Sequence, residues 1–182
     1  MMYGATHDRR SFREMEIRKI TKQDADSFWQ LRLEGLQQSP TSFSSSHEEA
    51  MLLSHEQVLK RINEAEDNYI LGCFDEAGEL VGMAGFMRET SLKLKHKGFI
   101  WGVYVTQKAR KQGIGRRLME DIIRRAKELP GLMQISLSVT SSNLPAKRMY
   151  ESLGFVTYGV ESNALFVDGV LWDEDLMALQ LL

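Results

Sequence analysis

The chain has 182 residues, of which 43% are hydrophobic and 26% charged, as in one ordinary globular domain. Basic residues number 23 against 25 acidic ones, and the resulting charge of −2 disfavours a nucleic-acid-binding protein, which would be basic. Cys73 is the only cysteine, so no disulfide can form within the chain and a cytoplasmic location is expected. No apolar run approaches the roughly 18 residues of a membrane span, so no membrane association is expected.

Hydrophobic patterning organises the first half of the chain. Residues 1–14 show no periodicity, and we expect a loose extension there, followed by one domain over residues 15–182. The elements expected next are a strand at 15–20, a helix that is capped within 21–24 and runs to about 37, a polar loop at 39–49 around a buried Phe43, a helix at 54–66, and a strand hairpin at 69–74 and 80–87 with its turn at 75–79.

The second half opens with residues 98–105, which are apolar on both faces, as is typical of a central strand. Apolar residues then recur with helical spacing over 113–128, with the pairs Glu120–Arg124 and Asp121–Arg125 expected on the outer face of the helix. The elements expected after this helix are a strand at 133–139, a helix capped by Asn143 that ends at Gly154, and strands at 155–160 and within 170–181.

A glycine pair marks the start of the helix at 113–128. Gly113 and Gly115 let the backbone turn sharply beside a ligand, and free N–H groups at a helix start attract anions such as pyrophosphate. Residues 107–128 carry eight basic and three acidic side chains, which agrees with an anion site. A short turn followed by a solvated helix face is the alternative. The P-loop string is absent, and Leu118 replaces the third glycine of the dinucleotide fingerprint.

Two longer motifs identify a resemblance. V-Y-V-T-x(3)-R-x-x-G-x-G at 103–115 resembles the acetyl-CoA motif of the GNAT superfamily of N-acetyltransferases, and N-L-P-A-K-R-M-Y-E-S-L-G-F at 143–155 is similar to its other cofactor motif. The order of elements agrees over 15–181. The resemblance implies a mixed α/β single-domain fold, with a mostly antiparallel, twisted sheet of about seven strands flanked by helices. It also implies a parallel strand pair that splays apart at the cofactor site.

The resemblance further implies acetyl-CoA as co-substrate, with its pantetheine arm paired to the backbone of Val103 and Val105. Asn143 would contact the pantetheine or the adjoining phosphates, and as a helix cap it also has a purely structural reading. The positions assigned to the cofactor by the resemblance are Val103, Tyr104, Val105, Arg110, Lys111, Gln112, Gly113, Gly115, Arg116, Asn143, Lys147 and Tyr150.

Tyr150 matches the tyrosine that family members use as general acid toward the departing thiolate. A thiol has a pKa of ~8.5 and tyrosine ~10, so a positioned phenol can hydrogen-bond or protonate the sulfur. Packing in the core is the alternative role, because Tyr150 shares a helix face with Met149 and Leu153. Phe99 stands where some members carry a glutamate base. Base catalysis must then come from another residue or through water, unless the amine is already neutral.

The resemblance implies an N-acetyltransferase that moves an acetyl group to a primary amine by direct attack on the thioester. An acyl-CoA-binding sensor without turnover is the alternative, and a pure interaction domain is a weaker one. No metal is expected, since the histidines lack ligand spacing. A small-molecule or peptide amine is the expected partner, and a homodimer is left open. The acceptor is expected near 38–54 and 161–172, where Glu48, Glu49, Glu161 and Asp168 weakly favour a cationic amine.

Overall fold

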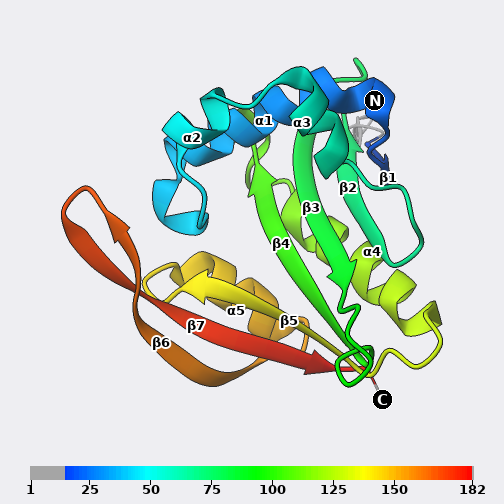
Figure 1. Cartoon of the computed structure of the whole chain (residues 1–182), viewed down its shortest axis with the longest axis vertical. Coiled ribbons are helices and arrows are strands. Elements are labelled where there is room, and N and C mark those ends of the chain that lie inside the picture. Colours follow the sequence, from blue (N-terminus) through cyan, green and yellow to red (C-terminus); the bar gives the residue numbers. More distant parts are fainter. Residues whose placement is uncertain (1–14, 182) are drawn as a thin grey trace, which may run out of the picture.

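Seven strands and five helices are built from these segments, as the computed structural model of residues 15–181 shows (Figure 1). The strands are β1 (Glu16–Lys19), β2 (Asn68–Phe74), β3 (Leu80–Arg88), β4 (Lys97–Val105), β5 (Gln134–Thr140), β6 (Val156–Val167) and β7 (Val170–Gln180). The helices are α1 (Ala25–Gln38), α2 (His47–Met51), α3 (His55–Arg61), α4 (Ile114–Glu128) and α5 (Leu144–Ser152), with 3-10 turns η1 (Lys22–Asp24), η2 (Pro40–Ser42) and η3 (Gln107–Ala109).

The strands form one sheet in the order β1-β2-β3-β4-β5-β7-β6. Every neighbouring pair is antiparallel except β4 and β5, which are parallel. The mixed α/β fold with one parallel pair, predicted from the resemblance, is therefore confirmed. No helix within residues 15–181 is both long enough and apolar enough to cross a membrane.

Two hydrophobic cores lie on opposite faces of the sheet, because side chains alternate along each strand. In β2, Tyr69 and Leu71 join the core beneath α4, whereas Ile70 and Phe74 join the core beneath α1. This double coverage explains why the central strands are continuous apolar runs.

A β-bulge in β4 is the main irregularity of the sheet. The pairing of β4 with β3 shifts between Met83 and Gly85, and Gly102 has a φ of 63°. The extra residue reverses the alternation: Ile100 faces the α4 core before the bulge, and Val103 and Val105 face it afterwards. An L-residue rarely adopts this φ, so glycine is needed here.

The segment expected to be a polar loop contains a helix of its own. Ser46 caps α2 by accepting a hydrogen bond from the Glu49 N–H (3.1 Å), a short local signal that periodicity does not reveal. The predicted helix at 54–66 is shorter than expected and ends at Arg61. Ile62 is extended and buried in the α1 core, so the chain leaves the helix to place this side chain.

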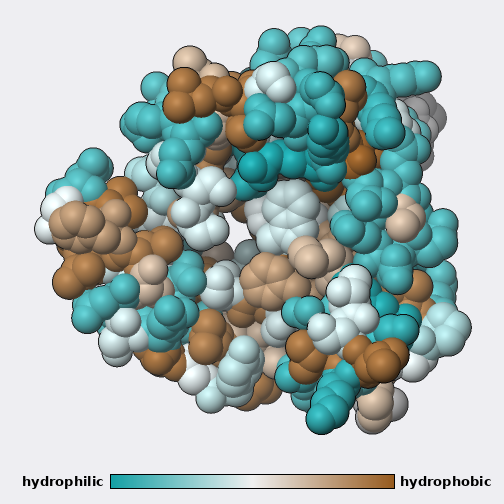
Figure 2. All heavy atoms as spheres, in the orientation of Figure 1, coloured by the Kyte–Doolittle hydropathy of each residue, from teal (hydrophilic) through white to brown (hydrophobic). Residues whose placement is uncertain are grey.

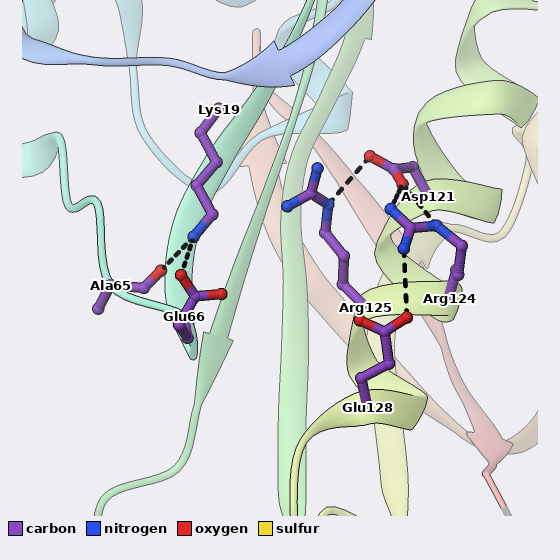
Figure 3. Close-up of polar contacts among 7 residues, drawn as sticks. All are labelled: Lys19, Ala65, Glu66, Asp121, Arg124, Arg125 and Glu128. Carbon is purple, nitrogen blue, oxygen red and sulfur yellow. Dashed lines mark hydrogen bonds and ion pairs between the residues drawn. The ribbon is translucent and has the colours of Figure 1, made fainter.

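Side chains on the outer face of α4 pair differently from the expectation (Figure 3). Asp121 accepts hydrogen bonds from Arg125 (3.0 Å), as predicted, and also from Arg124, which reaches Glu128 as well. The predicted Glu120–Arg124 pair is wrong, because Glu120 is bound by Arg116 one turn earlier (2.8 Å). Part of the Arg116 guanidinium group is therefore already hydrogen-bonded within the helix.

Candidate active site

The parallel pair β4–β5 separates after a short contact. Only Lys97, Gly98 and Phe99 pair with β5, although β4 continues to Val105 and β5 to Thr140. The other edge of β5 is paired with β7, so β5 follows β7 away from β4 (Figure 1). The bulge at Gly102 bends β4 just beyond the last paired residue.

This separation opens a cleft of about 990 Å³, lined by residues of both strands beyond the fork. Figure 2 shows the surface hollowed between the part formed by α1 and α2 and the part formed by β5, β7 and β6. The hydroxyl of Thr140, at the end of β5, donates to the carbonyl of Thr41 in η2, so the loop after α1 touches the far wall of the cleft. The backbone of β4 beyond Phe99 has no strand partner on this side among the described residues.

One end of the cleft has the properties of an anion site. Gly113 caps α4 with a φ of 75° and has no side chain to satisfy the N–H groups of the first turn. The first turn contains no acidic residue, so the positive end of the helix dipole is not neutralised. Lys111 is also left-handed, with a φ of 62°, a strained conformation for a lysine.

Four of the five residues that the resemblance assigns to the pyrophosphate line this end of the cleft: Lys111, Gly113, Gly115 and Arg116. Arg110, expected to bind the cofactor, lines it as well. Arg110 is oriented by a hydrogen bond from its Nε to the carbonyl of Val105 (3.1 Å). Arg116 pairs with Glu120 and donates to the Ser152 hydroxyl (2.7 Å), which ties α4 to α5.

Gln112 and Lys147, both expected to contact the cofactor, are not among the residues that line the cleft. The ammonium of Lys147 instead pairs with the buried Asp175 of β7 at 2.5 Å, which joins α5 to the sheet. Hydrogen bonding to Lys147 and Ser141 lowers the pKa of Asp175. The assignment of Gln112 and Lys147 to the cofactor stays a prediction, and the observed positions of these two residues do not favour it.

Val103 and Val105 line the cleft and pack toward the α4 core, so their main chain is what borders the opening. The Tyr104 side chain packs in the opposite core beside Phe43, and its hydroxyl donates to Glu34 of α1 (2.9 Å). Burial and this bond raise the pKa of Tyr104.

Tyr150 and Asn143 also line the cleft. The Tyr150 ring is buried and packs against Phe155, with ring centroids 6.0 Å apart. Burial raises its pKa to about 12, so the phenol stays neutral and able to donate at neutral pH. The Asn143 side chain accepts the Ala146 N–H (3.3 Å), which confirms it as the cap of α5. The same residue lines the cleft, and its contact with the cofactor stays a prediction.

The end opposite the anion site contains two charged residues that sequence reasoning missed. Arg32 of α1 and Glu174 of β7 line it, together with Ser39, Ser42, Phe43, Ser44 and Trp101. Arg32 could have been noticed, since it stands four residues from both Phe28 and Leu36 in the apolar stripe of α1. Glu174 has no such signal, because it is the middle one of three consecutive acids in a strand.

Only one of the two segments where the acceptor is expected reaches the cleft. Ser39, Ser42, Phe43 and Ser44 line the cleft, whereas none of 161–172 does. The four acids offered as a reason for a cationic acceptor (Glu48, Glu49, Glu161 and Asp168) lie outside it as well. Of the residues that the structure describes, four with cationic side chains line the cleft against one with a carboxylate, Glu174. Within residues 15–181, no group of three metal-ligating side chains comes together.

Comparison with known families decides what this geometry belongs to. The model of the acetyltransferase (GNAT) family matches residues 25–155, which is well over half of the chain. The chain belongs to the GNAT family. Its members are acetyltransferases that use acetyl-CoA, in agreement with the resemblance of the two motifs.

Solved GNAT structures share the fold of this chain. An acetyltransferase of the GNAT family from Streptococcus pneumoniae has a TM-score of 0.78 at 22% identity, over 92% of this chain and 99% of that one. A Salmonella typhimurium protein solved with its cofactor acetyl-CoA has a TM-score of 0.75 at 20% identity, over 92% and 94%. The ribosomal-protein-S18-alanine N-acetyltransferase of Escherichia coli gives 0.70 at 19%, over 92% and 94%. No curated protein matches the chain.

Proposed function

We propose that the protein is an N-acetyltransferase that moves an acetyl group from acetyl-CoA to a primary amine, which attacks the thioester directly. The observation that carries this proposal is the continuity of the cleft, from the anion site at α4 past Tyr150 to Glu174. Two substrates held in one cleft can react without an acyl-enzyme.

The residues present fit acetyl-CoA. Free N–H groups at Gly113 to Arg116, with Lys111 beside them, are suited to its pyrophosphate. The unpaired edge of β4 at Val103 and Val105 is suited to the amide-rich pantetheine arm, which can add to the sheet as a strand does. A β4 N–H near the thioester would stabilise the oxyanion that develops there.

Tyr150 is the proposed hydrogen-bond donor to the departing sulfur. A phenol with a pKa of about 12 stays protonated while negative charge develops on the sulfur. Its burial also strengthens this interaction, because little water competes for the sulfur.

Glu174 is the proposed base for the acceptor. A primary ammonium has a pKa of about 10 and must lose a proton before its nitrogen can attack. Among the described residues that line the cleft, Glu174 alone carries a carboxylate, and Phe99 cannot take a proton. Glu174 would accept the proton directly or through one water.

Release of free thiol from acetyl-CoA, measured against a panel of primary amines, tests the proposal. We expect release that depends on a particular class of amine. If acetyl-CoA raises the melting temperature and no amine releases thiol, the chain is an acyl-CoA-binding sensor instead. If acetyl-CoA leaves the melting temperature unchanged, the cofactor assignment is wrong.

A further inference from the structure

Arg32 is a buried cation that has no evident purpose in the fold. Its residue is only 7% exposed, and its Nη1 atom has no hydrogen-bond partner within residues 15–181. Burial, with a smaller contribution from the positive charge of Arg61, lowers its pKa to about 10. Buried charges in folded proteins are normally paired with an opposite charge, because desolvation without a partner is unfavourable.

The guanidinium group lies on the wall of the cleft. It stacks between the rings of Phe43 (5.6 Å) and Trp101 (5.4 Å), both of which line the cleft. Its Nη1 lies 3.2 Å from the place that a Cβ of Gly102 would occupy, so the glycine at the bulge leaves room for it. Arg32 also borders a second cavity, but neither ring nor Gly102 does, so the charged end belongs to the cleft.

No acidic side chain within residues 15–181 compensates this charge. The cleft holds one carboxylate, that of Glu174, among the described residues, and neither it nor any other acid contributes to the shifted pKa of Arg32. The two aromatic rings replace an acidic partner only in part. They interact with the faces of the guanidinium group, and its N–H groups, which lie in its plane, are left without acceptors. The missing partner is an oxyanion that two or more N–H groups can bind.

We propose that the acceptor is a small amine that also carries a carboxylate, as amino acids do, and that Arg32 binds this carboxylate. Ser39, Ser42 and Ser44 line the same end and supply further donors. Glu174, in the same cleft, faces the amine of the same molecule, so the two missed residues match the two charges of a zwitterion. The proposal rests on the proposed function and replaces the cationic amine expected from the acidic segments.

The test compares amines in matched pairs, each an amino acid and the same molecule without its carboxylate. We expect the wild type to favour the amino acid by roughly 10- to 100-fold in kcat/KM, the range of a charge-assisted hydrogen bond. In Arg32→Met, which keeps the packing length and loses the charge, this preference should fall to about one. Arg32→Lys keeps the charge without the planar fork and should show an intermediate preference.

Arg61→Met is the matched control. Arg61 is the neighbouring cation on α3, stacked on Trp29 and bordering the second cavity instead of the cleft. Its loss should leave the preference for the carboxylate unchanged. An equal loss in Arg61→Met would mean that general positive charge, not binding by Arg32, sets the preference, and would overturn the proposal.

Binding gives a second readout that does not need turnover. With CoA present, calorimetry should detect the amino acid of a pair on the wild type and not on Arg32→Met. Acetyl-CoA should stabilise the wild type and Arg32→Met equally, and this stabilisation also shows that the variant is folded. If Arg32→Met does not fold, Arg32→Lys takes its place in the binding experiment. Equal use and equal binding of both members of every pair by the wild type would overturn the inference and leave the proposed function intact. Binding without any thiol release would instead overturn the proposed function alone.

Discussion

Among single residues, the buried Tyr150 offers the most direct mutational test, because its hydroxyl can be removed without changing the ring. Phenylalanine keeps the ring contact with Phe155 and removes only the donor, so Tyr150→Phe should fold normally. If the hydroxyl donates to the departing sulfur, kcat should fall by roughly 10²–10⁴-fold while acetyl-CoA affinity changes little. Steady-state kinetics and calorimetry measure the two. Wild-type kcat in this variant would assign Tyr150 to core packing.

Glu174→Gln tests the base through its dependence on pH. At neutral pH the acceptor is an ammonium, and the variant should lose roughly 10²-fold in kcat/KM because nothing removes the proton. Above the amine pKa of about 10, the acceptor is already neutral and the loss should shrink. A loss that stays constant from pH 7 to 10 would mean that Glu174 only shapes the site.

At the scale of elements, the start of α4 binds charge through its backbone and its flanking cations. Acetyl-CoA affinity should fall as salt is added, since exposed charges are screened within ~10 Å at 0.1 M. Lys111→Ala should make this dependence shallower, and Arg116→Ala should do so to a smaller extent, because Arg116 is already paired with Glu120. Lys127→Ala, in the last turn of α4, is the control with an unchanged slope. Equal slopes in all four proteins would remove both cations from the phosphate site.

Asp24, at the junction between β1 and α1, should make the stability of the fold depend on pH. Hydrogen bonding to Arg18 and Thr21 lowers the pKa of Asp24 to about 2 from an ordinary value of 3.8. A lowered pKa stabilises the fold above pH ~4, and this contribution disappears as pH falls toward 2. Asp24→Asn should cost up to about 1 kcal/mol at pH 7, given that the pair is partly exposed, and much less at pH 2.

Thermal unfolding of Asp24→Asn and of the wild type at pH 7 and near pH 2 measures this difference. Asp26→Asn is the control, because Asp26 lies two residues on and its side chain is 86% exposed. A melting-temperature difference for Asp24→Asn that is the same at both pH values would show that the carboxylate does not titrate with folding.

At the scale of the whole molecule, the sheet has two parts held together by a short seam. β1–β4 and β5-β7-β6 share only the three pairs of β4 with β5 and separate beyond them (Figure 1). Residues of both strands beyond this point line the cleft. A ligand that bridges both parts adds contacts across this seam. At 100 times its dissociation constant, acetyl-CoA should stabilise the fold by about 2.7 kcal/mol, or roughly 5–10 °C in melting temperature.

The Gly115→Leu variant tests whether the rise in melting temperature with acetyl-CoA depends on binding at the start of α4. A Cβ at Gly115 would meet the Met149 Sδ at 3.6 Å, an ordinary contact, so the fold should persist, but the rest of a leucine side chain has to extend into the cleft. We expect a ligand-free melting temperature near that of the wild type and a much smaller shift with acetyl-CoA. A full shift in this variant would place the phosphates elsewhere.

Much of the architecture was determined by the sequence alone, because it depends on neighbours in the chain. The apolar run of β4, the helical spacing of α4 and the glycines at 113 and 115 act locally, and two motifs at the expected separation indicated the family. Two features with only weak local signals were not predicted from the sequence. α2 depends on one serine cap within a polar segment, and nothing in the sequence distinguished Gly102 as the residue that the β-bulge requires.

Only the tertiary structure decided which charged groups meet. Arg32 and Glu174 lie more than a hundred residues apart in the chain, and both line the cleft that opens where β5 leaves β4 to follow β7. The same packing directs Lys147 to Asp175 and not to the cleft. The partner of a charge depends on what the folded chain places within a few ångströms of it, and hydrophobic periodicity carries no information about that.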